Sequence, residues 1–273
     1  MKTQPIFILS SGRSGTYSIY NALKNEKEVD IYHEFLFEET LRNSVSYHMG
    51  LIKKKRISDF LDLSYVFSIR NSQKKIWIDS SNALPWMINP LKNKFHNAKF
   101  IFLVRNGKKV VSSFFNKYSD IMYNKRDINL LKRYIEKKNS ILSSEKKYWR
   151  PIPKNNKDFK NFVSKGQFYR ICKYWQEINQ TIRKNLKHVN KKNKFFFKFE
   201  DINDRKKTEE LFKFIGIKKN YSKIFKSFKK PVNVKYPKNF ALTKKQQLVF
   251  KNVCGEEMKI NGYEINDYYK VKY

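Results

Sequence analysis

The chain has 273 residues, enough for one large α/β domain or two smaller ones and for a substantial buried core. Aromatic residues make up 16% of it, which argues against a disordered chain. Lys and Arg number 59 against 24 acidic residues, giving a formal net charge of +35. Because these basic residues are spread along the whole chain, compositional drift explains them as well as a nucleic-acid footprint does.

The cysteine content and the apolar runs bear on the compartment of the protein. Cys172 and Cys254 lie far apart and have no His partners at ligand spacing, so we expect neither a disulfide framework nor a metal site. Such cysteine usage fits a reducing compartment. The first apolar run, Pro5–Leu9, is too short for a signal-peptide core, and no later run reaches bilayer length. We therefore expect a cytoplasmic protein without a membrane span; its oligomeric state stays open.

Short apolar runs bounded by polar turns predict the strands of a parallel sheet. In chain order they are Pro5–Leu9, the weaker Val29–Tyr32, Ile76–Ile78, Lys99–Val104 and Phe195–Phe199. Helical patterns lie between them, one of which covers Glu210–Ile215 and stops at Gly216, as expected for a glycine after a helix. Alternating strands and helices predict an α/β fold with one central parallel sheet flanked by helices.

Two segments add detail to this organisation. Residues 118–166 are very basic and contain the proline-rich Trp149–Pro153, so we interpret them as a helical lid or acceptor-binding insertion on one domain that spans residues 1–273. Near the end, Thr243 and Gln246 match a capping box, which predicts a last helix running toward Gly262.

The turn after the first strand is the strongest functional feature of the sequence. The segment Ser10–Tyr17 is rich in Gly and hydroxyl side chains and leads into a helix, an arrangement that directs backbone N–H groups at an anion. It is not a Walker A loop, because it offers Arg13-Ser-Gly-Thr16 where that motif needs Gly-Lys-Ser/Thr. The segment therefore predicts a phosphate cradle for a different type of ligand.

A second anion site is predicted at the end of the Lys99–Val104 strand. Arg105 stands at the strand tip, and Ser113 follows eight residues later in the next helix. Both can face the same carboxyl edge of the sheet as the cradle. A guanidinium fork together with a hydroxyl is suited to a second phosphate on the same ligand.

With these residues the chain resembles the sulfotransferases that use 3′-phosphoadenosine 5′-phosphosulfate (PAPS). The likeness continues through Phe197-Lys-Phe-Glu-Asp201, Phe240-Ala-Leu-Thr243 and Gly262-Tyr263, and it covers nearly the whole chain except the lid. It implies a sulfotransferase fold similar to that of the P-loop NTPases. It also implies transfer of a sulfuryl group from PAPS to a hydroxyl, with release of adenosine 3′,5′-bisphosphate and without a metal.

The resemblance assigns roles to particular residues. Arg13 is expected to bind the phosphosulfate and to act catalytically. The rest of the donor site comprises Ser14, Gly15, Thr16 and Tyr17 at the 5′-phosphosulfate, Arg105 and Ser113 at the 3′-phosphate, and Phe199 at the adenine. A basic stretch around Lys230, Asn233 and Lys235 is compatible with closure over the 3′-phosphate, but an ordinary solvated surface explains it equally well.

A general base is needed if the acceptor is a hydroxyl. The candidates are Glu34 and His33, which follow the Val29–Tyr32 strand and reach the ligand edge if that strand lies parallel beside the first. Glutamate here resembles the base of glycan-type sulfotransferases and favours a carbohydrate acceptor, although other small molecules stay possible. A His-Glu pair is also compatible with a plain structural hydrogen bond. His48, His96 and His188 are expected to be structural or solvated.

Two alternative functions deserve comparison. A nucleotide or small-molecule kinase shares the strand-loop-helix but needs the Gly-Lys-Ser/Thr lysine and Mg²⁺, and that lysine is missing. A nucleic-acid-binding protein would exploit the +35 charge, yet clustered basic and aromatic residues on one strand face are not visible. We therefore expect a small-molecule or glycan partner and no nucleic acid.

Overall fold

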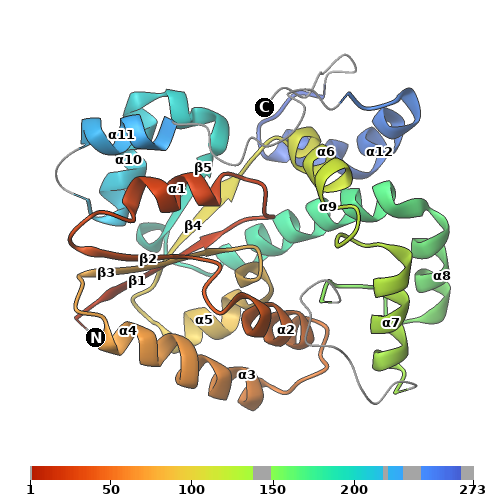
Figure 1. The fold of residues 1–273 in the computed structure, drawn as a ribbon, viewed down its shortest axis with the longest axis horizontal. Helices are drawn as coiled ribbons and strands as arrows, with labels where there is room; N and C mark the ends of the chain where they lie inside the picture. Colours follow the sequence, from red (N-terminus) through yellow and green to blue (C-terminus); the bar gives the residue numbers. More distant parts are fainter. Residues whose placement is uncertain (1, 138–148, 218–220, 230–240, 266–273) are drawn as a thin grey trace.

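The computed structural model describes residues 2–137, 149–217, 221–229 and 241–265. Its centre is a five-stranded parallel sheet in the order β2-β3-β1-β4-β5 (Figure 1). The strands are β1 (Gln4–Leu9), β2 (Val29–His33), β3 (Ile76–Ser81), β4 (Lys99–Val104) and β5 (Lys194–Lys198). The α/β fold with a central parallel sheet is therefore confirmed.

The sequence alternation of each inner strand divides the core between the two faces of the sheet. In β1, Phe7 and Leu9 belong to one buried cluster, whereas Ile6 and Ile8 belong to the other. All four side chains are fully buried, as expected for a parallel strand covered on both sides.

Helices cover both faces of the sheet (Figure 1). The face of Ile6 and Ile8 carries α1 (Thr16–Leu23), α10 (Arg205–Ile215) and α11 (Tyr221–Lys229). The other face carries α2 (Phe37–His48), α3 (Lys54–Leu61), α4 (Phe67–Asn71), α5 (Ile88–Lys94), α6 (Gly107–Lys117), α7 (Lys125–Ile135), α8 (Asn156–Ser164), α9 (Gly166–Leu186) and α12 (Lys244–Ile260). Short 3₁₀ turns cover Leu84–Met87, Lys191–Asn193 and Phe199–Asn203, and a π-helical turn, Asp62–Val66, joins α3 to α4.

The helix-end predictions agree with the structure. Gly216 has φ 109° at the end of α10, a left-handed conformation that favours glycine. Thr243 and Gln246 form the predicted capping box at the start of α12, which ends at Ile260 before Gly262. Both cysteines, Cys172 and Cys254, are buried and free.

Two strand predictions need correction. The β3 prediction ended at Ile78, but the strand continues through Asp79, Ser80 and Ser81, all of which are buried. Strand β2 pairs with β3 and not with β1, so it is an edge strand. Asp79 accounts for the misplaced end of β3, because a carboxylate usually marks a turn rather than a buried strand. The position of β2 beside β3 depends on the tertiary fold.

The segment 118–166 was predicted to be a lid. Its residues 138–148 lie outside the described part of the structure. Among the described ones, Tyr123, Leu131, Trp149 and Phe162 are buried in the same core cluster as Phe7. Helices α7 and α8 therefore share the main core, and their role as a lid stays a prediction.

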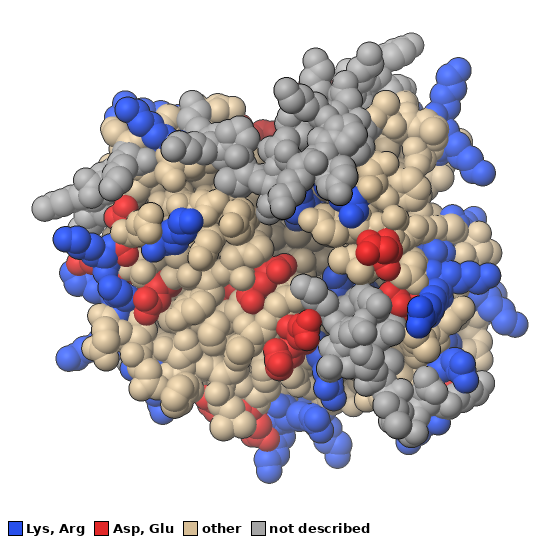
Figure 2. Space-filling view, viewed as in Figure 1, with Lys and Arg blue, Asp and Glu red and all other residues tan. Residues whose placement is uncertain are grey.

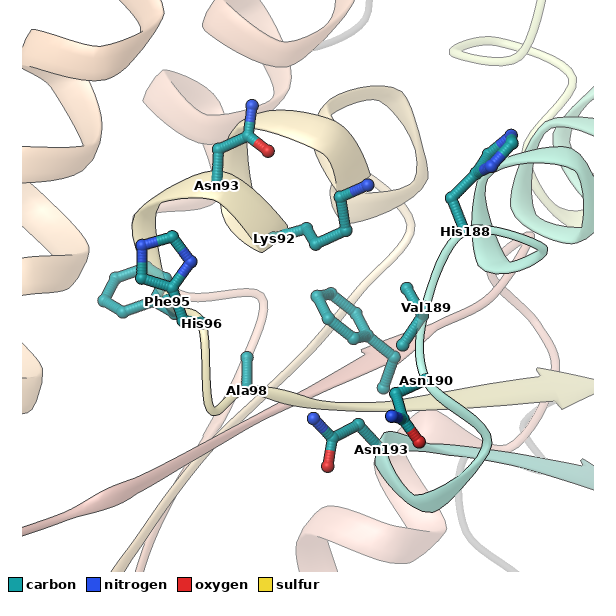
Figure 3. A pocket seen from close by; sticks show the side chains of 10 residues that line it. Lys92, Asn93, Phe95, His96, Ala98, His188, Val189, Asn190 and Asn193 are labelled. Atoms are coloured by element: carbon teal, nitrogen blue, oxygen red, sulfur yellow. The ribbon is translucent and has the colours of Figure 1, made fainter.

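The described surface has broad positive charge and a hollow at the amino edge of the sheet. Lys and Arg lie around the outline of the face in Figure 2, with acidic side chains among them nearer its middle. The hollow has a volume of ≈ 270 Å³, an apolar floor that includes Phe95 and Phe100, and a rim that includes exposed His96 and His188 (Figure 3). Within the described residues, no helix is long and apolar enough to cross a bilayer.

Candidate active site

The loop Ser10–Gly15 between β1 and α1 is held by its own hydroxyl groups. Ser14 donates from Oγ to the carbonyl oxygen of Gly12 at 3.0 Å, and its Oγ lies 3.0 Å from that of Ser11. The backbone N–H of Gly12 in turn donates to Ser10 Oγ at 3.1 Å. Because all three serines are buried, the serine-rich sequence fixes the shape of the loop before any ligand binds.

Gly15 ends this loop and begins α1. Its φ is 94°, and a Cβ at this position would lie 2.1 Å from the ring of Phe199, so only glycine fits. No side chain caps the start of α1. The first-turn N–H groups of a helix have no intrahelical partners and carry partial positive charge. The amino-terminal end of α1 therefore presents donors suited to an anion, and the binding role of Thr16 and Tyr17 stays a prediction.

The structure brings the two predicted anion sites into direct contact. Arg13 donates from Nε to Ser113 Oγ at 3.0 Å. Arg105 donates from Nη1 to the backbone oxygen of Arg13 at 3.0 Å. The guanidinium carbon of Arg13 also lies 5.1 Å from the ring centroid of Tyr118, a cation–π contact. Arg13 thus contacts residues that are 92 and 100 positions away in the sequence, and they meet at the carboxyl edge of β1 and β4.

Positive charge accumulates along α6 beside these arginines. Burial, and then the nearby guanidinium of Arg105, lower the pKa of Lys109. The pKa of Lys117 is lowered by burial and then by Arg13 and Arg105. Such mutual repulsion decreases when an anion binds among the cations. The electrostatics of this edge therefore favour a multiply charged anionic ligand.

Phe199 and Glu200 connect the cradle to the last part of the chain. The guanidinium carbon of Arg105 lies 5.1 Å from the Phe199 ring centroid. Glu200 accepts hydrogen bonds from the backbone N–H of Asn106 at 3.1 Å and from the Tyr263 hydroxyl at 2.6 Å. Phe199, Glu200 and Tyr263, from two of the segments that resemble the sulfotransferases, thus lie beside Arg105 and Asn106 at one edge of the sheet.

His33 lies on the α1 side of the carboxyl edge. Its Nε2 is 3.1 Å from Thr16 Oγ1, and its ring packs edge-on against Tyr17 with centroids 5.3 Å apart. Burial, and then the Arg13 guanidinium, lower the pKa of His33 to about 4. The imidazole is therefore neutral at neutral pH and forms part of the wall of the cradle.

Glu34 begins a strained turn that leads from β2 to α2. It has φ 64°, and Leu36 has φ 44°, both in the left-handed region that side-chain-bearing residues seldom adopt. Its N–H donates to the Ser80 carbonyl oxygen at 3.2 Å. The next residue, Phe35, donates its N–H to Asp79 Oδ1 at 3.1 Å. Neighbouring strand β3 thus holds the turn that carries Glu34.

Asp79 is the centre of a buried polar network beneath this turn. Its Oδ2 accepts from the Tyr65 hydroxyl at 2.9 Å, and Thr40 Oγ1 lies 3.3 Å from that hydroxyl. Burial, with a smaller contribution from the Glu34 carboxylate, raises the pKa of Asp79 to about 7, and the hydrogen bonds from Phe35 and Tyr65 oppose this rise. Asp79 and Glu34 are therefore close enough to influence each other's charge.

The predicted site residues divide into two groups. Arg13 to Tyr17, His33, Arg105, Ser113 and Phe199 surround the loop after β1. Glu34 lies in the turn after β2, where its N–H donates to Ser80 of β3, whereas His33 Nε2 lies beside Thr16 Oγ1. The stretch around Lys230, Asn233 and Lys235 lies outside the described residues.

Sequence reasoning gave no role to two buried polar residues of β3 and its following turn. One is Asp79; the charged residue directly after the apolar Ile76–Ile78 was the available signal. The other is Asn82, whose Nδ2 would be 2.9 Å from a Cβ on Gly12 and whose Oδ1 has no hydrogen-bond partner. An amide oxygen is thus available beside the cradle.

The structure was compared with those of known proteins to identify its fold. No protein-family model and no curated protein matches the sequence. The sulfotransferase STF9 from Mycobacterium avium matches the structure with a TM-score of 0.55 and 10% identity, over 97% of this chain and 78% of that one. The chain has the sulfotransferase fold.

Two further sulfotransferase structures match with lower scores. The sulfotransferase domain of the Synechococcus PCC 7002 olefin synthase has a TM-score of 0.49 and 14% identity, over 98% of this chain and 86% of that one. Mouse sulfotransferase SULT7A1, in a complex with PAP, has a TM-score of 0.44 and 17% identity, over 94% and 85%.

Proposed function

We propose that this protein is a sulfotransferase that moves a sulfuryl group from PAPS to an acceptor hydroxyl and releases adenosine 3′,5′-bisphosphate. The observation that carries the proposal is the contact of Arg13 with both Ser113 and Arg105 beside the start of α1. These groups suit a ligand with two separate phosphates better than one with a single chain of phosphates.

Each part of the cradle has a role in binding the donor. The N–H groups from Ser14 to Tyr17 and the Thr16 hydroxyl hold the 5′-phosphosulfate. Arg105 and Ser113 hold the 3′-phosphate, and the ring of Phe199 lines the adenine site. When PAPS binds, Arg13 exchanges its contact with Ser113 for a contact with the donor. Its guanidinium then supplies positive charge where the leaving oxygen develops negative charge.

Transfer proceeds in line, with the acceptor oxygen attacking sulfur as the bond from sulfur to the 5′-phosphate oxygen breaks. Glu34 accepts the proton of the acceptor hydroxyl. We favour Glu34 over His33 because His33 is engaged by Thr16 and has a pKa of about 4, which makes it a weak base. His33 instead orients the Thr16 hydroxyl.

The acceptor we propose is a carbohydrate hydroxyl, with residues 118–166 shaping the acceptor site as a lid. This choice follows from the resemblance at Glu34 to glycan-type enzymes. We further propose that the protein works in the cytoplasm, where its two free buried cysteines stay reduced. The proposed chemistry uses the arginines for charge stabilisation and needs no metal ion.

The experiment is a transfer assay with PAPS carrying labelled sulfate and a panel of sugar, phenol and amine acceptors. We expect transfer to at least one sugar, with equal rates in the presence and absence of a chelator. Transfer of phosphate from ATP that a chelator abolishes would instead identify a kinase. Transfer only to phenols or amines would retain the sulfotransferase and reject the carbohydrate acceptor.

A further inference from the structure

The helical segment Lys54–Asn71 exposes two large apolar side chains to solvent. Leu63 is 83% exposed and Phe67 is 67% exposed, the highest values among the large hydrophobic residues in the described part of the chain. They are four residues apart, so they lie on the same side of the helical segment. Neighbouring exposed apolar side chains with a polar rim are a feature of interaction surfaces.

The opposite side of the segment explains why this pair points outward. Ile57, Leu61, Tyr65 and Ile69 are fully buried and pack in the core cluster beneath the sheet. The π-helical turn Asp62–Val66 adds a residue to the helical repeat, and such turns are frequent at functional sites. Since the inner side packs in the core, Leu63 and Phe67 lie on the solvent side of the segment.

Positive charge surrounds the protruding pair. Over residues 53–75 the sequence has seven basic and two acidic residues. The four residues from Lys53 to Arg56 are exposed at one end of the segment, and Arg70 is exposed at the other. Of the two acids, Asp62 forms an ion pair with Lys94 at 2.7 Å, and Asp59 is exposed four residues before Leu63 on the same side of the segment. The helical segment thus has an exposed apolar pair near its middle and basic residues at both ends.

We propose that the Leu63–Phe67 pair and its flanking basic residues dock the protein on an anionic phospholipid surface. The acyl region of a bilayer accepts the two apolar side chains, and the anionic headgroups pair with the cations. A second copy of this chain also carries a charge of +35 and would be repelled. A peptide partner fits less well, because the pair protrudes and does not line a groove.

This docking leaves the candidate active site accessible. Helix α4 leads to the amino end of β3, whereas the cradle lies at the carboxyl edge of the sheet (Figure 1). The inference is independent of the proposed function, since it uses no residue of the cradle.

The test is co-sedimentation of the full chain with vesicles of phosphatidylcholine, with and without phosphatidylglycerol. We expect binding to the anionic vesicles, weakening as salt increases, and little binding to the neutral ones. The double variant Leu63→Ser, Phe67→Ser should partition at least roughly tenfold less, because it loses two apolar side chains that enter the bilayer. The control, Leu248→Ser, changes a 60% exposed leucine of α12 and should bind as the wild type does.

Three results would overturn the proposal. Unchanged binding of the double variant would mean that the net charge alone attracts the vesicles. Equal binding to neutral vesicles, or none to either kind, would reject the anionic surface. A dimer in light scattering that the double variant converts to a monomer, without vesicle binding, would assign the pair to a second copy.

Discussion

The donor half and the acceptor half of the candidate site are built in different ways. At β1 and β4, hydroxyl groups and arginines contact one another directly, as between Arg13 and Ser113. At β2 and β3, a buried carboxyl group, Asp79, holds the turn that carries Glu34 through the backbone of Phe35. In the proposed function, one half stabilises negative charge, while the other places an acid group that accepts a proton.

Because of this difference, variants in the two halves should have different effects. A change in the donor half should weaken nucleotide binding, whereas a change in the acceptor half should alter turnover with nucleotide binding retained.

Replacing the proposed base should have the largest effect. Glu34→Gln is expected to lower kcat by about 10² to 10⁴, the usual contribution of a general base, with unchanged affinity for adenosine 3′,5′-bisphosphate. The measurement is transfer of labelled sulfate to the acceptor found in the panel. Glu38→Gln, on the exposed start of α2, is the control. Loss of nucleotide affinity in Glu34→Gln with kcat intact would remove the distinction between the halves.

The buried carboxyl group of Asp79, in the acceptor half, should make the free energy of unfolding depend on pH. Its pKa is raised from 3.8 to about 7, so between these values the unfolded state ionises Asp79 while the folded state keeps it protonated. The free energy of unfolding should therefore decrease as pH rises through this window, by about 1.4 kcal/mol per unit of pKa difference.

Asp79→Asn tests this dependence because an amide does not ionise. Between about pH 4 and about pH 7, the urea midpoint of the variant should rise relative to that of the wild type. Above about pH 7 the difference between the two midpoints should stay constant. Asp59→Asn changes an exposed acid of α3 and serves as the control. Parallel profiles for Asp79→Asn and wild type would show that burial does not perturb this carboxyl group.

The donor half depends on a charged hydrogen-bonding group at β4. Arg105→Ala should weaken binding of adenosine 3′,5′-bisphosphate roughly 10- to 100-fold, since a charge-assisted hydrogen bond contributes about 1.5–3 kcal/mol. Isothermal titration is the measurement. Arg205→Ala removes an exposed arginine of α10 that pairs with Glu209 and should bind normally. Equal affinities for both variants would exclude Arg105 from the site.

The sequence predicts the donor half of the site better than the acceptor half. The loop Ser10–Gly15 and Arg105 were predictable because each lies directly after a strand, and parallel strands bring their carboxyl ends to one edge. The Asp79 network was not, because it joins residues of β3, α2 and the turn Asp62–Val66 that only the tertiary fold brings together. The position of β2 beside β3 is also a tertiary property.

Local sequence signals likewise explain what was predicted of the fold. Runs of β-branched and aromatic residues predicted the inner strands. Gly216 and Thr243 predicted the end of α10 and the start of α12, because each residue type is favoured at that helix end. The role of segment 118–166 depends on packing, because its aromatic residues Trp149 and Tyr123 serve the main core. Composition alone does not distinguish a core helix from a lid.

The central claim is that the cradle recognises both phosphates of one adenosine nucleotide. The most direct measurement compares the thermal shift of the wild type at saturating adenosine 3′,5′-bisphosphate with the shifts given by adenosine 5′-monophosphate and ATP. Since a ligand of the native state stabilises it by mass action, we expect the bisphosphate to give clearly the largest shift. No shift with the bisphosphate, or an equal shift with ATP, would contradict the account.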